Sequence, residues 1–276
     1  MFENNSRSYI HEKTTEVCFL KELVLSTKIY GAYRNRLLSN FGADFKEKTH
    51  DLEVQVQDVG SDERGHLTSQ ASGADNEFLK NVLEMEYGQT YTFDEIEVGS
   101  EYTGQLIDVG HVGYGIYVDI GVIAPTFVDA LLPLHRLRSQ MNMERASVRD
   151  IADAFTLVEH LPVGVIINDK NPHERTLEAT ISNPTLQRLN SWLSDDHDRL
   201  LVFGSSLAMI HGALAQSGHQ EDIYQIETLG RHEYCLVCKR TTNATGIITE
   251  IGPLLRGVPM HLFIPEEARS KRDDKT

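Results

Sequence analysis

Two tyrosines in the middle of the chain are the side chains best suited to contact a planar ligand. Tyr114 and Tyr117 lie in the segment Gly113–Gly121, whose sequence is GYGIYVDIG. A tyrosine ring on the outer face of a strand can stack on a nucleic-acid base, a contact worth roughly 1–3 kcal/mol per base. The alternative is that one or both rings pack into a barrel with the hydroxyl group at its rim. Tyr114 is the first candidate for base stacking and Tyr117 the second.

Basic side chains that could hold phosphate lie on both sides of these tyrosines. His111 precedes them in a turn, and His135, Arg136 and Arg138 follow in the stretch ALLPLHRLR. If that stretch is a strand, Arg136 and Arg138 share one of its sides and can contact a phosphate backbone. The alternative is a solvated strand edge paired with local acids such as Asp129. The predicted RNA-contacting set is Tyr114, Tyr117, His111, His135, Arg136 and Arg138.

The glycines of this segment invite comparison with phosphate-binding loops. Gly110, Gly113 and Gly115 stand in GHVGYG, a spacing that fits neither the dinucleotide-binding fingerprint nor the P-loop. No helix is expected directly after them. We therefore interpret them as part of a hairpin, in which glycine permits positive φ and tight bending.

Two other groups of residues resemble metal sites. Cys235 and Cys238, with His232 three residues before, are typical zinc ligands, but zinc usually takes four and a second pair is missing. Because the two cysteines are expected within one strand, their thiols should point to opposite faces. The run Asp195–Asp198 (DDHD) resembles a set of ligands for a hard cation, and we interpret it as a polar linker. The sequence predicts no metal and no cofactor.

A third group is basic. Lys239 and Arg240 lie close to Arg231 if the segments around them pair as a hairpin. They could form a small basic spot on the C-terminal part of the chain. The neighbouring strand sequence EYCLV lacks the aromatic pattern of an RNA-recognition motif.

No catalytic constellation is recognisable. The chain has neither a Gly-x-Ser-x-Gly elbow nor a His-Glu-x-x-His helix, and its 12 histidines are scattered. We predict that the protein is not an enzyme. A metal-dependent hydrolase that uses carboxylates on a barrel rim, Asp119 or Asp196, is the least favoured alternative.

Composition sets limits on the class of protein. The chain has 276 residues, 40% of them hydrophobic, which suffices for two or three domains. Its net charge of −15 argues against non-specific coating of nucleic acid, because such binding needs many Lys or Arg contacts to phosphate. Three cysteines, no apolar run of membrane-spanning length and an N-terminus unlike a secretory signal favour the cytoplasm.

Both outer parts of the chain predict mixed α and β structure. Residues 21–95 have the periodicity of strand, helix, strand, strand and helix, with Gln89–Phe93 as a further strand. Residues 198–265 repeat that order and end on a strand at Met260–Ile264. This βαββαβ order is typical of a ferredoxin-like unit. We expect a flexible arm at residues 1–20 and a flexible tail at 266–276.

The central part, residues 96–184, has a different pattern. Its strands are short and its turns frequent, as a small barrel requires. One helix interrupts it, capped by Ser147. A helix inserted after the third strand is common in OB-type barrels. The predicted fold class is α+β, a five-stranded OB-type barrel flanked by two ferredoxin-like units.

At this point the central segment resembles a known motif. The S1-like RNA-binding motif opens with Val-Gly and a glycine-containing strand, matched by Val98, Gly99 and Gly104. Its aromatic-Gly-x-aromatic-Val-Asp-x-Gly strand pair is matched by Tyr114 to Gly121, and its later Val-Gly by Val163–Gly164. Where the motif usually has His and Ser, this chain has Pro133 and His135.

The whole chain is similar to an archaeal domain-of-unknown-function family, DUF2110. The similarity lies in the opening LSTKIYG, the central GYGIYVDIG and the closing IETLGRHEYCLVCKRTTNATGIITEIGPLL. It implies a cytoplasmic protein of information processing, with an S1-like middle domain and no assigned catalytic residues.

Together these features predict a non-enzymatic RNA-binding factor associated with archaeal translation or transcription. Its partners would be RNA or a ribonucleoprotein and other proteins, with no membrane. The main alternative is a protein-interaction adaptor that uses the OB scaffold without nucleic acid, which the acidic charge favours.

Overall fold

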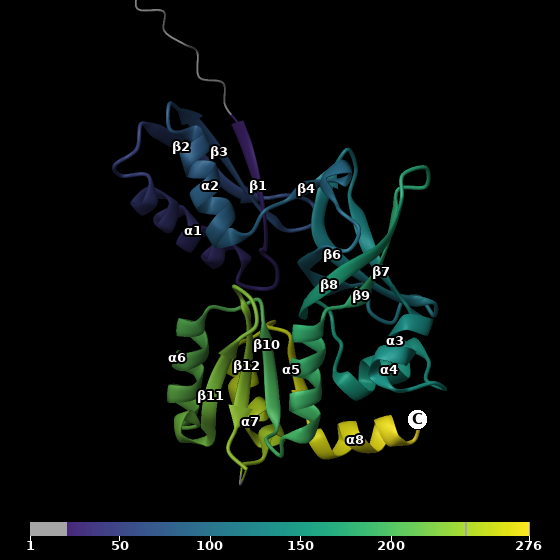
Figure 1. Ribbon diagram of the computed structural model, residues 1–276. Coiled ribbons are helices and arrows are strands. Elements are labelled where there is room, and N and C mark those ends of the chain that lie inside the picture. The colour runs from purple at the N-terminus through teal and green to yellow at the C-terminus, as the bar shows by residue number, and fades with distance from the viewer. Residues whose placement is uncertain (1–20, 241, 276) are drawn as a thin grey trace, which may run out of the picture.

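The computed structural model describes residues 21–240 and 242–275, so the predicted arm at 1–20 lies outside the described residues (Figure 1). The chain folds as an α+β protein with a central barrel. In the described residues, no helix combines the length and the apolar character needed to cross a membrane.

The N-terminal domain is a three-stranded antiparallel sheet with two helices on one face. Its elements are β1 (Lys21–Lys28), α1 (Arg34–Lys48), β2 (Val54–Ser61), β3 (His66–Gly73) and α2 (Asn76–Tyr87), and the strand order is β1-β3-β2. Apolar residues recur every four positions on each helix, so each helix buries one face. Phe41 and Leu79 thus share a core with Leu25.

The last predicted strand of this domain joins a different sheet. β4 (Tyr91–Thr92) pairs in parallel with β6 (Gly115–Ala124) of the barrel instead of with β1, so the N-terminal unit lacks the fourth strand of a ferredoxin-like sheet. The ferredoxin-like sheet expected for residues 21–95 is therefore incomplete. The residues that follow explain the change of partner, because Phe93 and Ile96 are buried in the barrel core.

The central domain is a closed five-stranded barrel. It consists of β5 (Glu101–Ile107), β6 (Gly115–Ala124), β7 (Val128–Pro133), β8 (Pro162–Asn171) and β9 (Thr176–Ile181). The strands close in the order β5-β6-β7-β9-β8, with β7 and β9 parallel and the other pairs antiparallel. This order, with helices between the third and fourth strands, confirms the predicted OB-like barrel.

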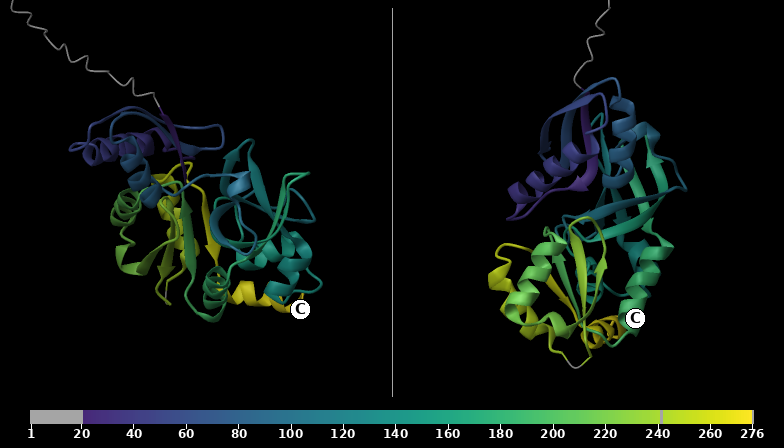
Figure 2. Two further views of the ribbon diagram at one scale, coloured as in Figure 1. Left: turned by 45° about the horizontal axis from the view of Figure 1, so that its top comes forward. Right: turned by 90° about the vertical axis from the view of Figure 1, so that its left-hand side faces the viewer.

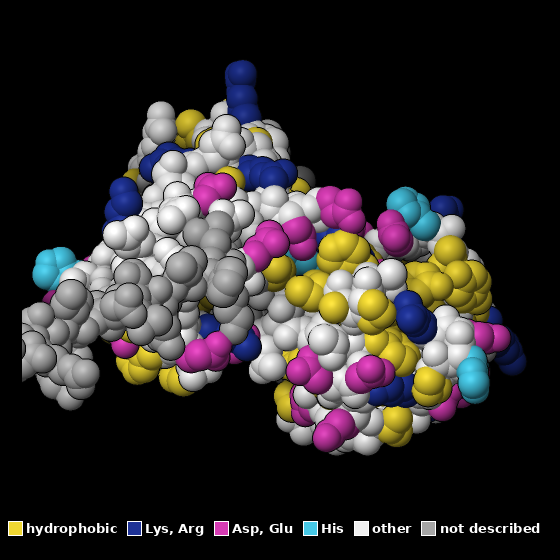
Figure 3. Space-filling model, turned by 90° about the horizontal axis from the view of Figure 1, so that it is seen from above, with side chains coloured by type: hydrophobic (Ala, Val, Ile, Leu, Met, Phe, Trp, Pro, Cys, Tyr) yellow, Lys and Arg dark blue, Asp and Glu magenta, His cyan; other side chains and the backbone are white. Residues whose placement is uncertain are grey.

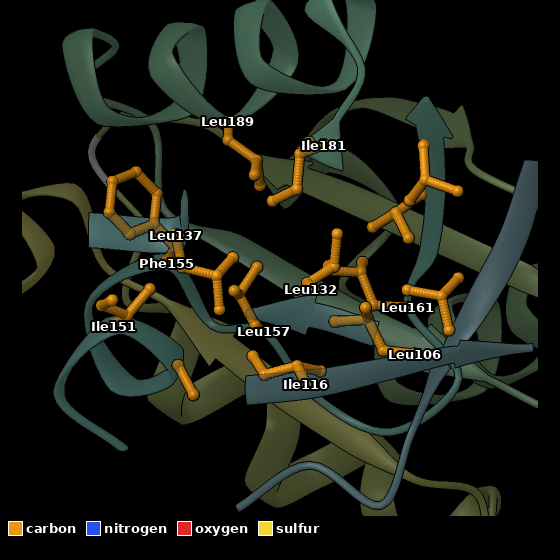
Figure 4. Close-up of a cluster of buried hydrophobic side chains, with 14 of the residues drawn as sticks. Leu106, Ile116, Leu132, Leu137, Ile151, Phe155, Leu157, Leu161, Ile181 and Leu189 are labelled. Carbon is orange, nitrogen blue, oxygen red and sulfur yellow. The ribbon is translucent and has the colours of Figure 1, made fainter. Parts of the chain in front are cut away.

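The barrel interior is filled by aliphatic side chains from every strand. Leu106, Ile116, Leu132 and Ile181 point toward one another, and Phe155 closes one end (Figure 4). Two motif glycines stand where strands approach too closely for a side chain. A Cβ at Gly104 would lie 2.3 Å from the Asp119 carbonyl oxygen, and one at Gly115 would lie 2.5 Å from that of Leu132.

Two helices follow the third barrel strand. They are α3 (Leu134–Met141) and α4 (Val148–Phe155). The helix capped by Ser147 was predicted, and the Ser147 hydroxyl accepts a hydrogen bond from the Asp150 amide at 3.2 Å. The predicted strand at Arg136 and Arg138 was wrong. Leu137 and Met141, four residues apart, are both buried, so the helical spacing decides the structure there.

The C-terminal domain has the complete ferredoxin-like topology. Its elements are β10 (Arg199–Phe203), α6 (Leu207–Ser217), η2 (Gln220–Asp222), β11 (Ile223–Thr228), β12 (Glu233–Cys238), α7 (Ala244–Ile251), η3 (Gly252–Leu254) and β13 (Met260–Phe263). The strand order is β11-β12-β10-β13, entirely antiparallel. Helix α5 (Asn183–Ser194) joins this domain to the barrel and lies beside the sheet (Figures 1 and 2).

The expected flexible tail is a helix in its described part. Helix α8 (Pro265–Asp273) runs from the C-terminal domain to beneath α4 (Figure 1). Ala268 is buried there, and the Arg269 guanidinium donates a 2.7 Å hydrogen bond to the Leu193 carbonyl at the end of α5. Tertiary contacts thus hold a segment whose sequence is polar on nearly all sides.

Candidate nucleic-acid interface

The outer face of β6, β7 and β9 brings the two tyrosines together. Tyr114 is 56% exposed and Tyr117 is partly buried, with their ring centroids 6.3 Å apart at an interplanar angle of 89°. Their hydroxyl groups are hydrogen-bonded at 2.9 Å. That bond, with burial, raises the pKa of Tyr117 to about 12. Tyr117 therefore holds Tyr114 in place while the Tyr114 ring faces solvent.

A hollow of about 340 Å³ lies next to Tyr117. Its sides carry Phe127 and Leu131, and Arg175 stands at its edge in the loop between β8 and β9. Arg175 is exposed and forms no ion pair with a described residue. The hollow thus combines apolar walls with an unpaired cation, a combination suited to a base and its phosphate.

The other basic residues predicted for this face are dispersed. The Arg136 guanidinium lies 4.0 Å from the Glu178 carboxylate at the hollow, so it borders the face. Arg138 instead donates a 2.7 Å hydrogen bond to the Ala146 carbonyl, which fixes the turn after α3. His135 is exposed at the start of α3.

His111 does not lie on the face that carries the two tyrosines. Its side chain is 75% exposed in the loop between β5 and β6, with Nδ1 3.3 Å from an Asp108 carboxylate oxygen. It lines a groove on the side of the barrel that faces the C-terminal domain.

The N-terminal domain supplies a residue to the same face. The Arg64 guanidinium, in the turn between β2 and β3, donates to both carboxylate oxygens of Asp129, at 2.8 and 2.9 Å. It also lies 5.1 Å from the Phe127 ring centroid. Arg64 therefore covers one edge of the hollow and neutralises the acid there.

Charge on this part of the molecule is mixed. Arg64 pairs with Asp129, and Arg136 stands near Glu178. Seen from above in Figure 3, acidic and basic side chains alternate with hydrophobic ones, and no continuous basic tract covers the described residues of that view. The arrangement provides local cations and not a basic surface.

A buried charge cluster fixes the N-terminal domain on the barrel. The Lys28 ammonium lies 2.6 Å from the Asp119 carboxylate, and both side chains are at most 5% exposed. His66 faces the same carboxylate at 3.2 Å through Nε2 and Asp62 at 2.9 Å through Nδ1. Burial alone would raise the pKa of Asp119, but His66, Lys28 and Arg64 outweigh it and hold that pKa well below its ordinary range.

A second buried cluster connects all three domains. The Glu233 carboxylate, 2% exposed, accepts hydrogen bonds from Tyr30 at 2.6 Å and Gln105 at 3.0 Å. Burial raises the pKa of Glu233. The Tyr30 ring stacks on His160 with 3.7 Å between centroids. A cavity of about 130 Å³ lies between the domains at this point.

Family models match all three parts of the chain. The DUF2110 N-terminal domain matches residues 22–92, the central domain residues 96–193 and the C-terminal domain residues 197–262. The chain belongs to the DUF2110 family. None of the curated proteins compared with it matches.

The two cysteines considered as zinc ligands are buried in two different apolar cores. Cys235 and Cys238 lie on opposite faces of the C-terminal sheet, one in the core shared with the barrel and the other under α6 and α7. Burial raises the pKa of both thiols, to about 11 for Cys238. Within residues 21–240 and 242–275, no three His, Cys, Asp or Glu side chains come together as metal ligands would.

The acidic run and the basic spot are also occupied by contacts within the protein. The Asp195 carboxylate pairs with Arg199, and that of Asp196 lies 3.6 Å from Arg269. Arg231 reaches the N-terminal domain, 3.2 Å from Glu86, so it does not join Lys239 in a basic spot. Asp119 is buried beside Lys28 and His66 and is not on a barrel rim.

Three residues of the face were missed by sequence reasoning: Phe127, Arg175 and Arg64. Arg175 carried a signal, since the loop between the fourth and fifth strands borders the binding face of OB barrels. Phe127 follows directly on a Pro-Thr turn and has no spacing that marks it. Arg64 belongs to another domain, and only the domain arrangement brings it to the barrel.

Proposed function

We propose that this chain binds single-stranded RNA on the outer face of β6, β7 and β9, as a non-enzymatic cytoplasmic factor of archaeal translation or transcription. One observation carries the proposal. Tyr114 stands exposed beside a hollow edged by the unpaired Arg175, on the side of the barrel where OB folds bind oligonucleotides. The S1-like pattern of glycines and aromatics in β5 and β6 adds support.

The geometry favours an unpaired strand. A base can stack on the Tyr114 ring only if its face is free, and in a duplex both faces of a base are covered by its neighbours. Arg175 and Arg136 can then contact the phosphates on either side. The acids near them keep the number of effective phosphate contacts low.

The test is the binding of a fluorescein-labelled single-stranded RNA of about twelve nucleotides, a length within the usual range for an OB fold. We expect Tyr114→Ala to weaken binding about 5- to 150-fold, the loss equivalent to one stacked base. Tyr224→Ala is the matched control, since Tyr224 is 65% exposed on β11 of the C-terminal domain.

A second pair of variants tests the phosphate contact. Arg175→Ala should reduce the dependence of log K on log salt by about 0.7. Arg256→Ala, which removes an exposed arginine of the C-terminal domain, should leave it unchanged. Equal binding by the Tyr114 and Tyr224 variants, or no RNA binding at low salt, would show that the proposal is wrong.

The second candidate function is a protein-interaction adaptor. The net charge of −15 and the pairing of Arg64 with Asp129 favour it, because they leave few cations free for phosphate. A pull-down from native cell extract with and without nuclease separates the two. Partners that survive nuclease treatment, together with no RNA binding in vitro, favour the adaptor.

A further inference from the structure

A groove of about 790 Å³ separates the barrel from the C-terminal domain. One wall is built by α4 and by the loop between β5 and β6, and the other by α7, α8 and β13. We call it the β13 groove. It lies on another side of the barrel from the hollow at Tyr117, and His111 is at its rim.

The strand in this groove has an unpaired edge. β13 is the last strand of its sheet and pairs only with β10. The Phe203 amide donates a hydrogen bond to the Pro259 carbonyl. Because hydrogen-bonded pairs alternate along an antiparallel ladder, the amides and carbonyls of His261 and Phe263 point toward β10, where they face Leu201 and Arg199. Met260 and Leu262 therefore direct their amides and carbonyls outward.

These outward groups have no partner among the described residues. No main-chain or side-chain hydrogen bond joins Met260 or Leu262 to any described group on that edge. Met260, His261 and Leu262 all line the groove and are only partly buried. A row of two unpaired amides and two unpaired carbonyls is a template for one more strand.

The walls around this edge combine apolar surface with two unpaired cations. Ile248 and Val158 supply apolar contacts on opposite sides. Arg149 of α4 and Lys271 of α8 are exposed, line the groove and form no ion pair with a described residue. An occupant with alternating apolar and acidic side chains complements both features.

A polynucleotide fits this groove less well than a peptide. Phosphates can accept hydrogen bonds from the outward amides, but they leave the carbonyls between them without donors. Asp153 and Glu159 also line the α4 side, so the groove suits an occupant whose acidic groups lie only beside Arg149 and Lys271 better than a polynucleotide, which carries a phosphate at every nucleotide. A strand of polypeptide satisfies amides and carbonyls alike.

We propose that the β13 groove binds an extended, acidic segment of a partner protein, which pairs with β13 as a fifth strand of the C-terminal sheet. Its acidic side chains pair with Arg149 and Lys271, and its apolar side chains contact Ile248 and Val158. This site is separate from the barrel face and does not depend on RNA binding there. The protein would thereby join a protein partner to whatever the barrel face holds.

The test uses the full chain and a labelled heptapeptide, acetyl-Glu-Val-Asp-Ile-Glu-Val-Thr amide, with a Gln/Asn counterpart that lacks the acids. We expect saturable binding of the acidic peptide and an approximately tenfold loss in the Arg149→Ala/Lys271→Ala double variant, as two modest ion pairs predict. The counterpart should bind equally to both proteins. Arg256→Ala is the control for removing an exposed arginine elsewhere.

Amide hydrogen exchange reports the strand pairing directly. The Met260 and Leu262 amides should exchange rapidly in the free protein and become protected when the peptide is added. The His261 amide, already turned toward β10, should not change. A Leu262→Pro variant removes one outward amide at an edge where proline is tolerated, and it should abolish binding.

Three results would overturn the proposal. They are the absence of saturable peptide binding, binding that leaves the exchange of Met260 and Leu262 unchanged, and a double variant that loses RNA affinity while keeping peptide affinity. The last would assign the groove to a polynucleotide. If Leu262→Pro fails to fold, a peptide N-methylated at alternate residues replaces it, since it also removes pairing amides.

Discussion

Asp119 of the barrel is the centre of the buried charge cluster that contacts the N-terminal domain. Its carboxylate pairs with the Lys28 ammonium at 2.6 Å and lies 3.2 Å from His66 Nε2 and 3.6 Å from the Arg64 guanidinium. Asp119→Asn keeps the shape but leaves the buried Lys28 ammonium without an opposite charge, whereas Arg64 keeps Asp129. We expect it to lower the free energy of unfolding by about 3–5 kcal/mol. Urea titration measures this, with Asp51→Asn, which is 95% exposed, as the control.

The loss should depend on pH in a defined window. The pKa of Asp119 in the folded protein lies far below the ordinary 3.8, so only the unfolded chain takes up a proton near that pH. The stabilisation from Asp119 is therefore complete above about pH 5 and is lost as the pH falls below 3.8. The difference between Asp119→Asn and the natural protein should be constant from pH 8 to 5 and shrink below 4. A difference that already shrinks between pH 7 and 5 contradicts the assignment of the charge.

At this scale the sequence identifies residue types better than partners. Tyr114 could be named as an exposed aromatic because the strand and its glycines are local patterns. Glu233 and Tyr30 could not be paired, since they are 203 positions apart and meet only where three domains converge. Buried charges have no periodic signal of their own, and their partners are set by the tertiary structure.

The helices differ in how well capping residues and apolar spacing in the sequence predict them. Ser147 precedes α4 with an acid three positions on, and the reciprocal hydrogen bonds of a capping box are both present. The segment 134–141 was misassigned because a short apolar run fits either period, and the contacts of Leu137 with the barrel core decide for the helix. Helix α8 was missed because its own sequence has little apolar surface.

Removing the α4 cap tests the contribution of this element. Ser147→Ala deletes the acceptor for the Asp150 amide and should lower the free energy of unfolding by about 1 kcal/mol. Ser139→Ala, at an exposed position inside α3, should change it by less than about 0.5 kcal/mol. Urea titrations of the two variants make the comparison. Equal values would mean that tertiary packing, and not the cap, fixes the start of α4.

At the scale of the whole molecule, the domains share strands and charges. β4 leaves the N-terminal domain to pair with the barrel, Lys28 binds Asp119 of the barrel, and Tyr30 binds Glu233 of the C-terminal domain. The periodicity of apolar residues predicts three modules, but it describes the strands and helices within each module and not the contacts between modules. The contacts between modules are made by β4, by the two buried polar clusters and by the apolar core that the barrel shares with the C-terminal sheet, and that periodicity indicates none of them.

These contacts between domains should make the three domains unfold in one transition. Trp192, the only tryptophan, is buried in α5 between the barrel and the C-terminal sheet, so its fluorescence reports those two domains. Far-UV circular dichroism reports all three. We expect the two signals to coincide in a urea titration of the natural protein. The double variant Lys28→Met/Tyr30→Phe removes the ion pair with Asp119 of the barrel and the hydrogen bond to Glu233 of the C-terminal domain. In this variant, circular dichroism should show an unfolding step at lower urea that the Trp192 fluorescence does not show.

The matched control is Lys46→Met/Tyr224→Phe, which makes the same two changes at exposed positions. Its signals should still coincide, since neither side chain bridges two domains. The early step should account for the strands and helices of residues 21–87 and leave the Trp192 environment intact. If the first double variant still unfolds in one transition, the cohesion of the molecule comes from its apolar interfaces and from β4, and the two buried polar clusters only orient the domains.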